Sequence, residues 1–178
     1  DPLGPDNLLG FVTGPLTGTP VPSSGRYTVV GKAPLTGTWG DSNSGGYFGP
    51  EVKAAGYDAV FFSGISPKPV YLLLHKGKAE LRDAAHLWGK DTVNTEKILR
   101  QELDDPAIRV ACIGPSGESQ SLIAAIINDE GRAAARGGLA AVMGAKRLKA
   151  IVARGTDKVP VADSNRISAL RKEYVKAL

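Results

Sequence analysis

The chain has 178 residues, of which 42% are hydrophobic and 22% charged, and its formal net charge is +4. This composition is that of a globular protein and argues against a disordered chain. Basic residues are mostly dispersed and aromatic residues make up only 6%, so nucleic-acid binding is not expected. The longest apolar run, LIAAII at 122–127, is far shorter than the ~20 residues that cross a bilayer. We therefore expect no membrane span and a cytoplasmic protein.

The start of the chain indicates a segment of a longer polypeptide. The first residue is Asp rather than Met, and DPLGPDNLLG reads as interior sequence. We expect one domain over residues 1–161 that is truncated at its start. A helix over 162–178 is then expected to lead into a further domain outside this sequence.

In the first half of the chain, strands dominate. A short helix is expected over 50–55, because Pro50 suits the first helical turn and Gly56 suits its end. Five segments rich in β-branched and aromatic residues between turn residues predict strands: 8–14, 25–33, 57–64, 69–77 and 78–84.

The second half mixes helices and strands. A helix is expected over 94–105, followed by a strand at 109–114, a turn at 115–119 and a strand at 121–129. Strands outnumber helices and do not alternate with them, so the sequence predicts an α+β fold rather than a doubly wound sheet. The remaining expected elements are a helix over 137–146, a strand at 148–155 and the helix over 162–178.

The last expected helix carries an apolar stripe at helical spacing. Asp163 or Ser164 is its expected N-cap, because both side chains accept hydrogen bonds from the first helical turn. The stripe runs to the final residue, so we expect part of it to pack on chain outside this sequence. Its members are Ile167, Leu170, Tyr174 and Leu178.

Two segments share one layout. Gly45-Gly46 precedes a short expected helix, a lysine and a strand, and Gly137-Gly138 precedes the same series later in the chain. The match needs an offset of one residue, so the repeat is weak. Two similar lobes related by a pseudo-two-fold axis would explain it, and such an axis suits a ligand with two similar halves.

These glycine pairs suit an anion. Without Cβ atoms the backbone can approach a bulky ligand, and the N–H groups at a helix start favour phosphate. Arg26, Arg132 and Arg136 lie nearby in the sequence and can bind phosphate through two parallel hydrogen bonds. Asn43 can both donate and accept. Between Arg132 and Arg154 there are six basic residues and no acidic one, which also favours an anion site. The alternative is that each pair only makes a tight turn between sheet and helix.

Other residues that often carry chemistry are interpreted as structural. Cys112 is flanked by apolar residues, which is typical of a buried small hydrophobe. One cysteine and two histidines cannot supply a protein-ligated iron–sulfur or zinc site. His75 and His86 lie at or beside expected strand ends, where a structural role is expected. Packing roles are expected for the aromatic residues Trp39, Tyr47 and Trp88.

Several long motifs resemble the N-terminal domain of tungsten-dependent aldehyde ferredoxin oxidoreductases, in uninterrupted order through nearly the whole chain. The resemblance implies two β-sheets related by a pseudo-two-fold axis, with short flanking helices, that form a cradle for a bis-pterin cofactor. The two pterins of this tungstopterin would hold the tungsten through their dithiolene sulfurs, so no protein ligand is needed. The motifs are GPLTGT with GRYTVV, SNSGGYFGPEVKAAGYDAV, DAAHLWGKDT, GPSGE and INDEGRAAARGGLAAVMGAKRLKAI.

The resemblance also implies roles for single residues. Arg26 would hydrogen-bond the pterin. Asn43 and Ala133 would offer backbone carbonyls to a Mg²⁺ ion that bridges the two pterin phosphates, since Mg²⁺ prefers oxygen ligands. The family usually has glycine at the position of Ala135, but a backbone contact survives there if φ stays negative. The residues that would hold phosphate and pterin edges are Gly45, Gly46, Arg132, Ala135, Arg136 and Gly137.

The implied activity is the oxidation of aldehydes to carboxylic acids, with electrons passed through a 4Fe–4S cluster to ferredoxin. Cluster cysteines and acid/base residues would lie in downstream domains, so this segment alone is expected to be inactive. The implied partners are an aldehyde, ferredoxin or a similar acceptor, the downstream domains, and a second copy or an electron-transfer subunit. Two alternatives stay open: the same fold in a tungsten aromatic acyl-CoA reductase, and a non-catalytic phosphate- or nucleotide-binding module.

Overall fold

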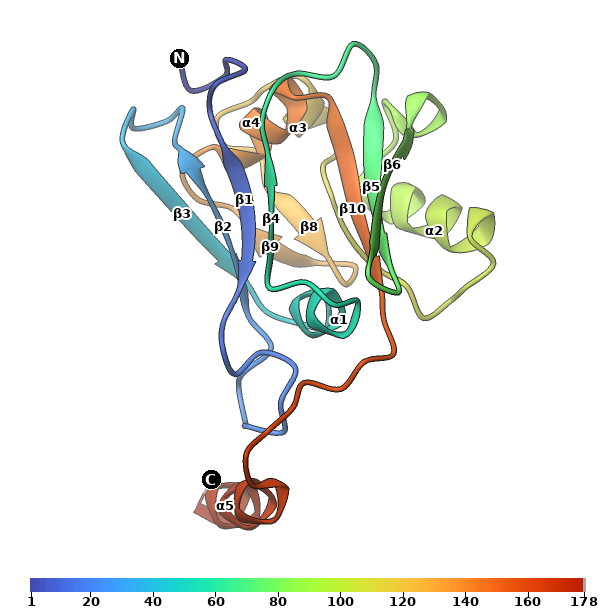
Figure 1. The fold of residues 1–178 in the computed structure, drawn as a ribbon. Coiled ribbons are helices and arrows are strands. Elements are labelled where there is room, and N and C mark those ends of the chain that lie inside the picture. The colour runs from blue at the N-terminus through green and yellow to red at the C-terminus, as the bar shows by residue number, and fades with distance from the viewer. Residues whose placement is uncertain (178) are drawn as a thin grey trace.

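The computed structural model describes residues 1–177, and two β-sheets form its frame (Figure 1). The first, sheet A, has four strands in the spatial order β3-β2-β1-β4, and each neighbouring pair is antiparallel. Strand β3 is therefore an edge strand, and one side of its backbone lacks a partner within the sheet. The strands are β1 (Leu9–Thr13), β2 (Tyr27–Lys32), β3 (Trp39–Ser44) and β4 (Ala59–Phe62).

The second, sheet B, has six strands in the order β6-β5-β10-β7-β8-β9. Only the β5–β10 pair is parallel, and β9 is an edge strand like β3. The strands are β5 (Val70–His75), β6 (Lys78–Asp83), β7 (Arg109–Cys112), β8 (Ile126–Asn128), β9 (Arg132–Ala134) and β10 (Leu148–Arg154).

Short helices fill the space between the sheets (Figure 1). Helices α1 (Phe48–Ala54) and α4 (Leu139–Ala145) pack against both sheets and join them in one apolar core. All seven residues of α4 are buried, which explains why its sequence is apolar on every side. Helix α2 (Thr92–Glu102) instead covers the outer face of sheet B, where Leu99 belongs to a second core.

Helix α5 (Ser164–Ala177) stands apart from both sheets and has no buried residue (Figure 1). The Asp163 carboxylate accepts a hydrogen bond from Arg166 N at 2.8 Å, as expected of an N-cap. Leu178, the last member of the expected stripe, lies outside the described residues, and what covers the stripe stays a prediction. Within residues 1–177, no helix combines the length and apolar character of a membrane span. The remaining short helices are η1 (Ala85–Leu87) and α3 (Pro115–Glu118).

The order of elements occurs twice along the chain. Strands β1, β2 and β3 are followed by α1 and β4, and β7, β8 and β9 are followed by α4 and β10. The spatial orders β3-β2-β1-β4 and β9-β8-β7-β10 match as well. Helix α3 is an insertion in the second unit, and the β5–β6 hairpin extends its sheet. The two glycine pairs of the sequence thus lie at equivalent places, between the third strand and the helix of each unit.

The α+β prediction is confirmed, but several local expectations are wrong. Strands β3 and β9 were not predicted, because WGDSNS and RAA lack the β-branched residues of a typical strand. The expected turn at 115–119 contains helix α3. The expected strand at 121–129 is confined to β8, because the chain turns before it and leaves Ile123 85% exposed.

Gly144 is the point where α4 touches α3. A Cβ atom at this position would lie 1.9 Å from the Gly117 carbonyl oxygen, which belongs to α3. We expect Gly144→Ala to lower the free energy of unfolding by about 1–3 kcal/mol, because the clash with backbone outweighs the better helix propensity of alanine. Urea titration checks this, with Gly131→Ala as the control, since nothing lies within 4 Å of a Cβ there. Equal stability of the two variants would contradict the close contact.

Cys112 is buried in β7, as the sequence predicted, and burial raises the pKa of its thiol to about 12. The raised pKa leaves far less thiolate at neutral pH than an exposed cysteine has. We expect the folded protein to resist a thiol-specific reagent at neutral pH, and the protein unfolded in guanidinium chloride to react at once. Rapid labelling of the folded protein would contradict this placement.

Candidate functional site

The edge strands of the two sheets lie side by side, and we call residues 40–46 and 132–137 the sheet-edge seam. At one end, a Cβ on Gly45 would lie 3.7 Å from Arg132 Nη1. In the middle, Arg136 N donates to Ser42 Oγ at 2.9 Å. At the other end, a Cβ on Gly137 would lie 3.7 Å from the Gly40 Cα. The two segments therefore run in opposite directions along the seam.

A hollow of about 370 Å³ lies at the Gly45 end of the seam. Arg26 and Arg132 both border it, and Arg26 Nη1 donates to Asn43 Oδ1 at 2.7 Å. The structure thus brings together residues that are far apart in the sequence and were singled out from it. The full lining is Ser23, Gly25, Arg26, Gly45, Gly46, Tyr47 and Arg132.

The other predicted residues lie farther along the same seam. Asn43, Ala133, Ala135 and Arg136 are exposed, and Gly137 is half-buried at the far end. The two glycine pairs therefore lie at opposite ends of one seam rather than side by side. The alternation of burial along β3, with Asn43 out and Ser44 in, places the exposed side chains of this strand on one face.

The starts of helices α1 and α4 were expected to offer free N–H groups to phosphate, but one is occupied and the other is buried. The first N–H at α1, from Tyr47, donates to the Asp129 carboxylate at 2.7 Å, so this donor is already occupied. The first residues of α4 are buried, and a Cβ on Gly138 would lie 3.0 Å from Pro34 Cγ. Gly46, Gly137 and Gly138 all have positive φ. Positive φ agrees with the alternative role of these glycines, the formation of tight turns, and leaves their predicted backbone contacts with a ligand untested.

Most of the basic residues between Arg132 and Arg154 are engaged elsewhere. Lys149 is fully buried and pairs with Glu118. Lys146 donates to the Gly64 carbonyl at 3.0 Å, and burial lowers the pKa of its ammonium. Arg154 pairs with Glu51 and Asp105, and Arg147 donates to Pro67 O. Among residues 1–177, the side chains of Arg132 and Arg136 make no ion pair. Of the six basic residues, these two therefore stay as candidates for binding an anion. The paired residues are Glu118–Lys149, Glu51–Arg154 and Asp105–Arg154.

The aromatic and histidine expectations have mixed outcomes. Trp39 and Tyr47 were expected to pack, but they are 72% and 62% exposed. Trp88 is half-buried. His86 makes a 2.9 Å contact with Glu102, which also accepts from the buried Tyr71, so a structural role fits it.

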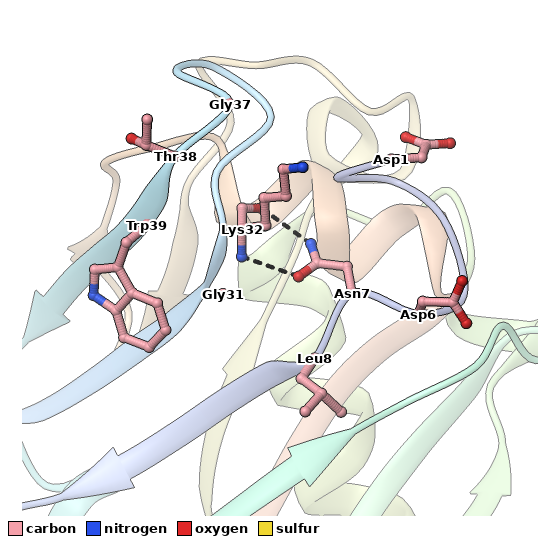
Figure 2. Close-up of a pocket in the computed structure, with 9 residues that line it drawn as sticks. All are labelled: Asp1, Asp6, Asn7, Leu8, Gly31, Lys32, Gly37, Thr38 and Trp39. Atoms are coloured by element: carbon pink, nitrogen blue, oxygen red, sulfur yellow. Dashed lines mark hydrogen bonds between the residues drawn. The ribbon is translucent and has the colours of Figure 1, made fainter.

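Figure 2 shows a second hollow, of about 530 Å³, beside the start of β3. Asn7 is one of its lining residues, and both ends of its amide bond the backbone of Lys32. Lys32 N donates to Asn7 Oδ1 at 2.9 Å, and Asn7 Nδ2 donates to the Lys32 carbonyl. The Trp39 ring forms one wall. The charged side chains around it do not converge on a common point in this view, so we assign no chemistry to this hollow.

Two residues that contact the seam were missed from the sequence. Asn128 ends β8 and Asp129 begins the β8–β9 turn. The Asn128 side chain accepts hydrogen bonds from sheet A, and the Asp129 carboxylate accepts one from Tyr47 N, at the start of α1. The sequence signal was a pair of polar residues directly after an apolar run, which was interpreted only as the end of a strand.

These features define a domain of two sheets whose edge strands meet at a seam, with a hollow bordered by Arg26 and Arg132 at one end. A family model described as the aldehyde ferredoxin oxidoreductase N-terminal domain matches residues 1–155, and the chain belongs to this family. A tungsten-containing aldehyde ferredoxin oxidoreductase of Pyrococcus abyssi is 49% identical over the whole chain, and that of Pyrococcus furiosus is also 49% identical. The chain spans 29% of the length of each.

The chain is also similar to two proteins with other names. An aliphatic sulfonate oxidoreductase, WOR-like subunit, of Pyrococcus furiosus is 36% identical, and the chain spans 30% of its length. Among solved structures, the active site complex BamBC of benzoyl coenzyme A reductase with 1,5-dienoyl-CoA matches with a TM-score of 0.95 and 42% identity. That match covers 99% of this chain and 27% of the other.

Proposed function

We propose that this chain is the cofactor-binding domain of a tungsten oxidoreductase that oxidises aldehydes to carboxylic acids. The observation that carries the proposal is the sheet-edge seam, which gathers Arg26, Asn43, Gly45 and Arg132 at one hollow. A domain over residues 1–161 holds the seam, and the helix that follows leads toward the rest of the protein.

The hollow fits one phosphorylated half of a bis-pterin cofactor. Arg132 presents a guanidinium without an ion-pair partner among residues 1–177, and such a group binds phosphate through parallel hydrogen bonds. Arg26 also borders the hollow and donates to Asn43, and there it would donate to the pterin. Gly45 leaves its side-chain position open except toward Arg132, so the backbone is accessible to a bulky ligand.

The seam also fits a bridging Mg²⁺ ion. Asn43 and Ala133 belong to the edge strands β3 and β9, and an edge strand leaves some of its carbonyl groups without a partner strand. Carbonyl oxygens are ligands that Mg²⁺ accepts, together with the phosphates it would bridge. Both residues are exposed, so a ligand lying along the seam can reach them.

The doubled order of elements supports a pseudo-two-fold axis through the seam. The first glycine pair lies beside Arg132 in space. The second pair directly follows Ala135 and Arg136 in the sequence and occupies the equivalent place of the other unit. A cofactor with two similar halves would then find one seat at each end. Gly137 would contact the second half of the cofactor through its backbone. Its side-chain position faces Ala33 and is therefore not open to a ligand.

When bound, the cofactor supplies the metal and its two-electron redox chemistry, and this chain supplies binding and orientation. Within residues 1–177, no three His, Cys, Asp or Glu side chains cluster as metal ligands. A 4Fe–4S cluster and the acid/base residues would be supplied downstream. Ferredoxin or a similar acceptor would take the electrons, and a second copy or an electron-transfer subunit completes the proposed partners.

The structural match to benzoyl coenzyme A reductase favours a second candidate function, the reduction of an aromatic acyl-CoA. Both candidates need tungsten, whereas a non-catalytic phosphate-binding module does not. Elemental analysis of the natively purified full-length protein separates them from the module, because a single bis-pterin site predicts about one tungsten per chain. Aldehyde-dependent reduction of ferredoxin, compared with acyl-CoA reduction, then decides between the two enzymes. Absence of tungsten from protein that is folded would overturn the proposal.

A further inference from the structure

Asn128 joins the two sheets from a fully buried position at the end of β8. Its Oδ1 accepts hydrogen bonds from Ser44 Oγ at 2.7 Å and from Tyr27 OH at 3.0 Å, both on sheet A. Its Nδ2 donates to the Gly45 carbonyl at 2.9 Å. One amide therefore ties sheet B to the end of β3 and to the turn at residues 45–47.

Asp129 holds the same turn from the next position. Its Oδ2 accepts from Tyr47 N at 2.7 Å and from Asn128 Nδ2 at 2.8 Å, and its side chain is only 9% exposed. Its Oδ1 lies 3.7 Å from Arg109 Nη1, and the Arg109 guanidinium lies 4.9 Å from the centre of the Tyr47 ring. Asp129 therefore holds the backbone of Tyr47, and the Arg109 guanidinium, which faces Asp129, holds its ring.

Gly46 leaves the space that this arrangement needs. Its φ is +99°, and a Cβ there would lie 2.2 Å from Asp129 Oδ2 and 2.7 Å from Arg132 Cδ. The carboxylate and the stem of Arg132 therefore occupy the place of a side chain at this position. The stem of Arg132 therefore packs against the same turn that Asp129 holds.

We propose that Asn128 and Asp129 form a cross-sheet latch that positions the 45–47 turn and Arg132 for the phosphate of the cofactor. The proposal rests on the proposed function, because the phosphate belongs to the bis-pterin. Asp129 does not line the hollow, so its charge acts on the turn rather than repelling the ligand. Asn128 and Asp129 are positioning residues and are not expected to touch the cofactor.

Asp129→Ala in the full-length protein tests the latch. We expect its tungsten and pterin content per chain to fall by about tenfold, as loss of a buried charge-assisted contact implies. Hydrogen exchange at the Tyr47 amide should become faster, which reports the broken contact independently of cofactor loading. Asp129→Asn keeps an acceptor oxygen and tolerates positive φ, so it should recover most of the cofactor content.

Glu130→Ala is the matched control. Glu130 lies in the same turn with φ of +66°, so both replacements place alanine in left-handed backbone, but its side chain is 76% exposed. We expect its tungsten content and Tyr47 exchange to match the wild type. Should Asp129→Ala fail to fold, Ser44→Ala provides the test, because it removes one hydrogen bond to Asn128 and should lower tungsten content severalfold.

The outcomes separate the latch from the proposed function. Wild-type protein without tungsten or pterin would overturn the proposed function and the latch with it. Wild-type protein that carries tungsten, alongside an Asp129→Ala variant with equal tungsten and unchanged Tyr47 exchange, would overturn the latch alone. Equal losses in Asp129→Ala and Glu130→Ala would also overturn it, since strain in the turn would then explain both.

Discussion

Replacing Arg132 with alanine is expected to strip cofactor from the full-length protein. Its guanidinium borders the hollow at the Gly45 end of the seam and makes no ion pair within residues 1–177. Loss of charged hydrogen bonds to phosphate costs about 1.5–3 kcal/mol, which is roughly a tenfold to hundredfold loss of affinity. Tungsten content per chain, measured by elemental analysis, checks this. The tungsten content of Arg132→Lys should lie between those of the wild type and Arg132→Ala, because lysine keeps the charge but lacks the planar guanidinium.

Arg166→Ala is the control for this variant, since Arg166 lies exposed on α5 away from the seam. It should carry as much tungsten as the wild type. The thermal stability of cofactor-free Arg132→Ala should stay close to that of the wild type, because the side chain is exposed. Unchanged tungsten content in Arg132→Ala would contradict the role of Arg132 in the seam.

The largest effect on stability is expected at Lys149. Its ammonium is fully buried in β10 and donates to the Lys90 and Ile113 carbonyls at 2.7 Å and to the Glu118 carboxylate. Glu118 also accepts from Gly89 N, so the ion pair pins the 89–90 turn to α3. Lys149→Met leaves the carboxylate buried without its cation, and we expect the free energy of unfolding to fall by about 3–5 kcal/mol.

A second substitution tests the cause of that loss. In Lys149→Met with Glu118→Gln the unpaired charge is gone and Gly89 N keeps an acceptor, so part of the stability should return. Lys172→Met, at an exposed position on α5, is the control and should change stability little. Urea titration provides the measurement. A loss below about 1 kcal/mol for Lys149→Met would show that the pair contributes nothing net.

Elements with strong local signals could be predicted from the sequence. The apolar strands β1, β2, β5 and β10 were expected near their observed places, because burial dictates their composition. Helices α1, α2, α4 and α5 were also expected near theirs. Strands β3 and β9 gave no such signal. They are edge strands with exposed or small residues, and only their partners in the sheets define them.

The site could be predicted in its residues but not in its geometry. Arg132 and Gly45 were singled out by residue type, yet their adjacency depends on two sheet edges meeting, which no local pattern reveals. The same holds for Asp129, which occupies the start of α1, where phosphate was expected. The buried ion pair between Lys149 and Glu118 was also not predicted from the sequence. Lysine is mostly a surface residue, so a buried lysine is recognised only once its partners are known.

We propose that the seam between β3 and β9 binds the tungsten cofactor through its phosphates. The most direct test is a crystal structure of the full-length holoprotein with anomalous data collected at a tungsten absorption edge. We predict a tungsten peak facing the exposed side of the seam, with phosphate density within hydrogen-bonding reach of Arg132. A tungsten peak over another surface, with no phosphate density along the seam, would contradict the account.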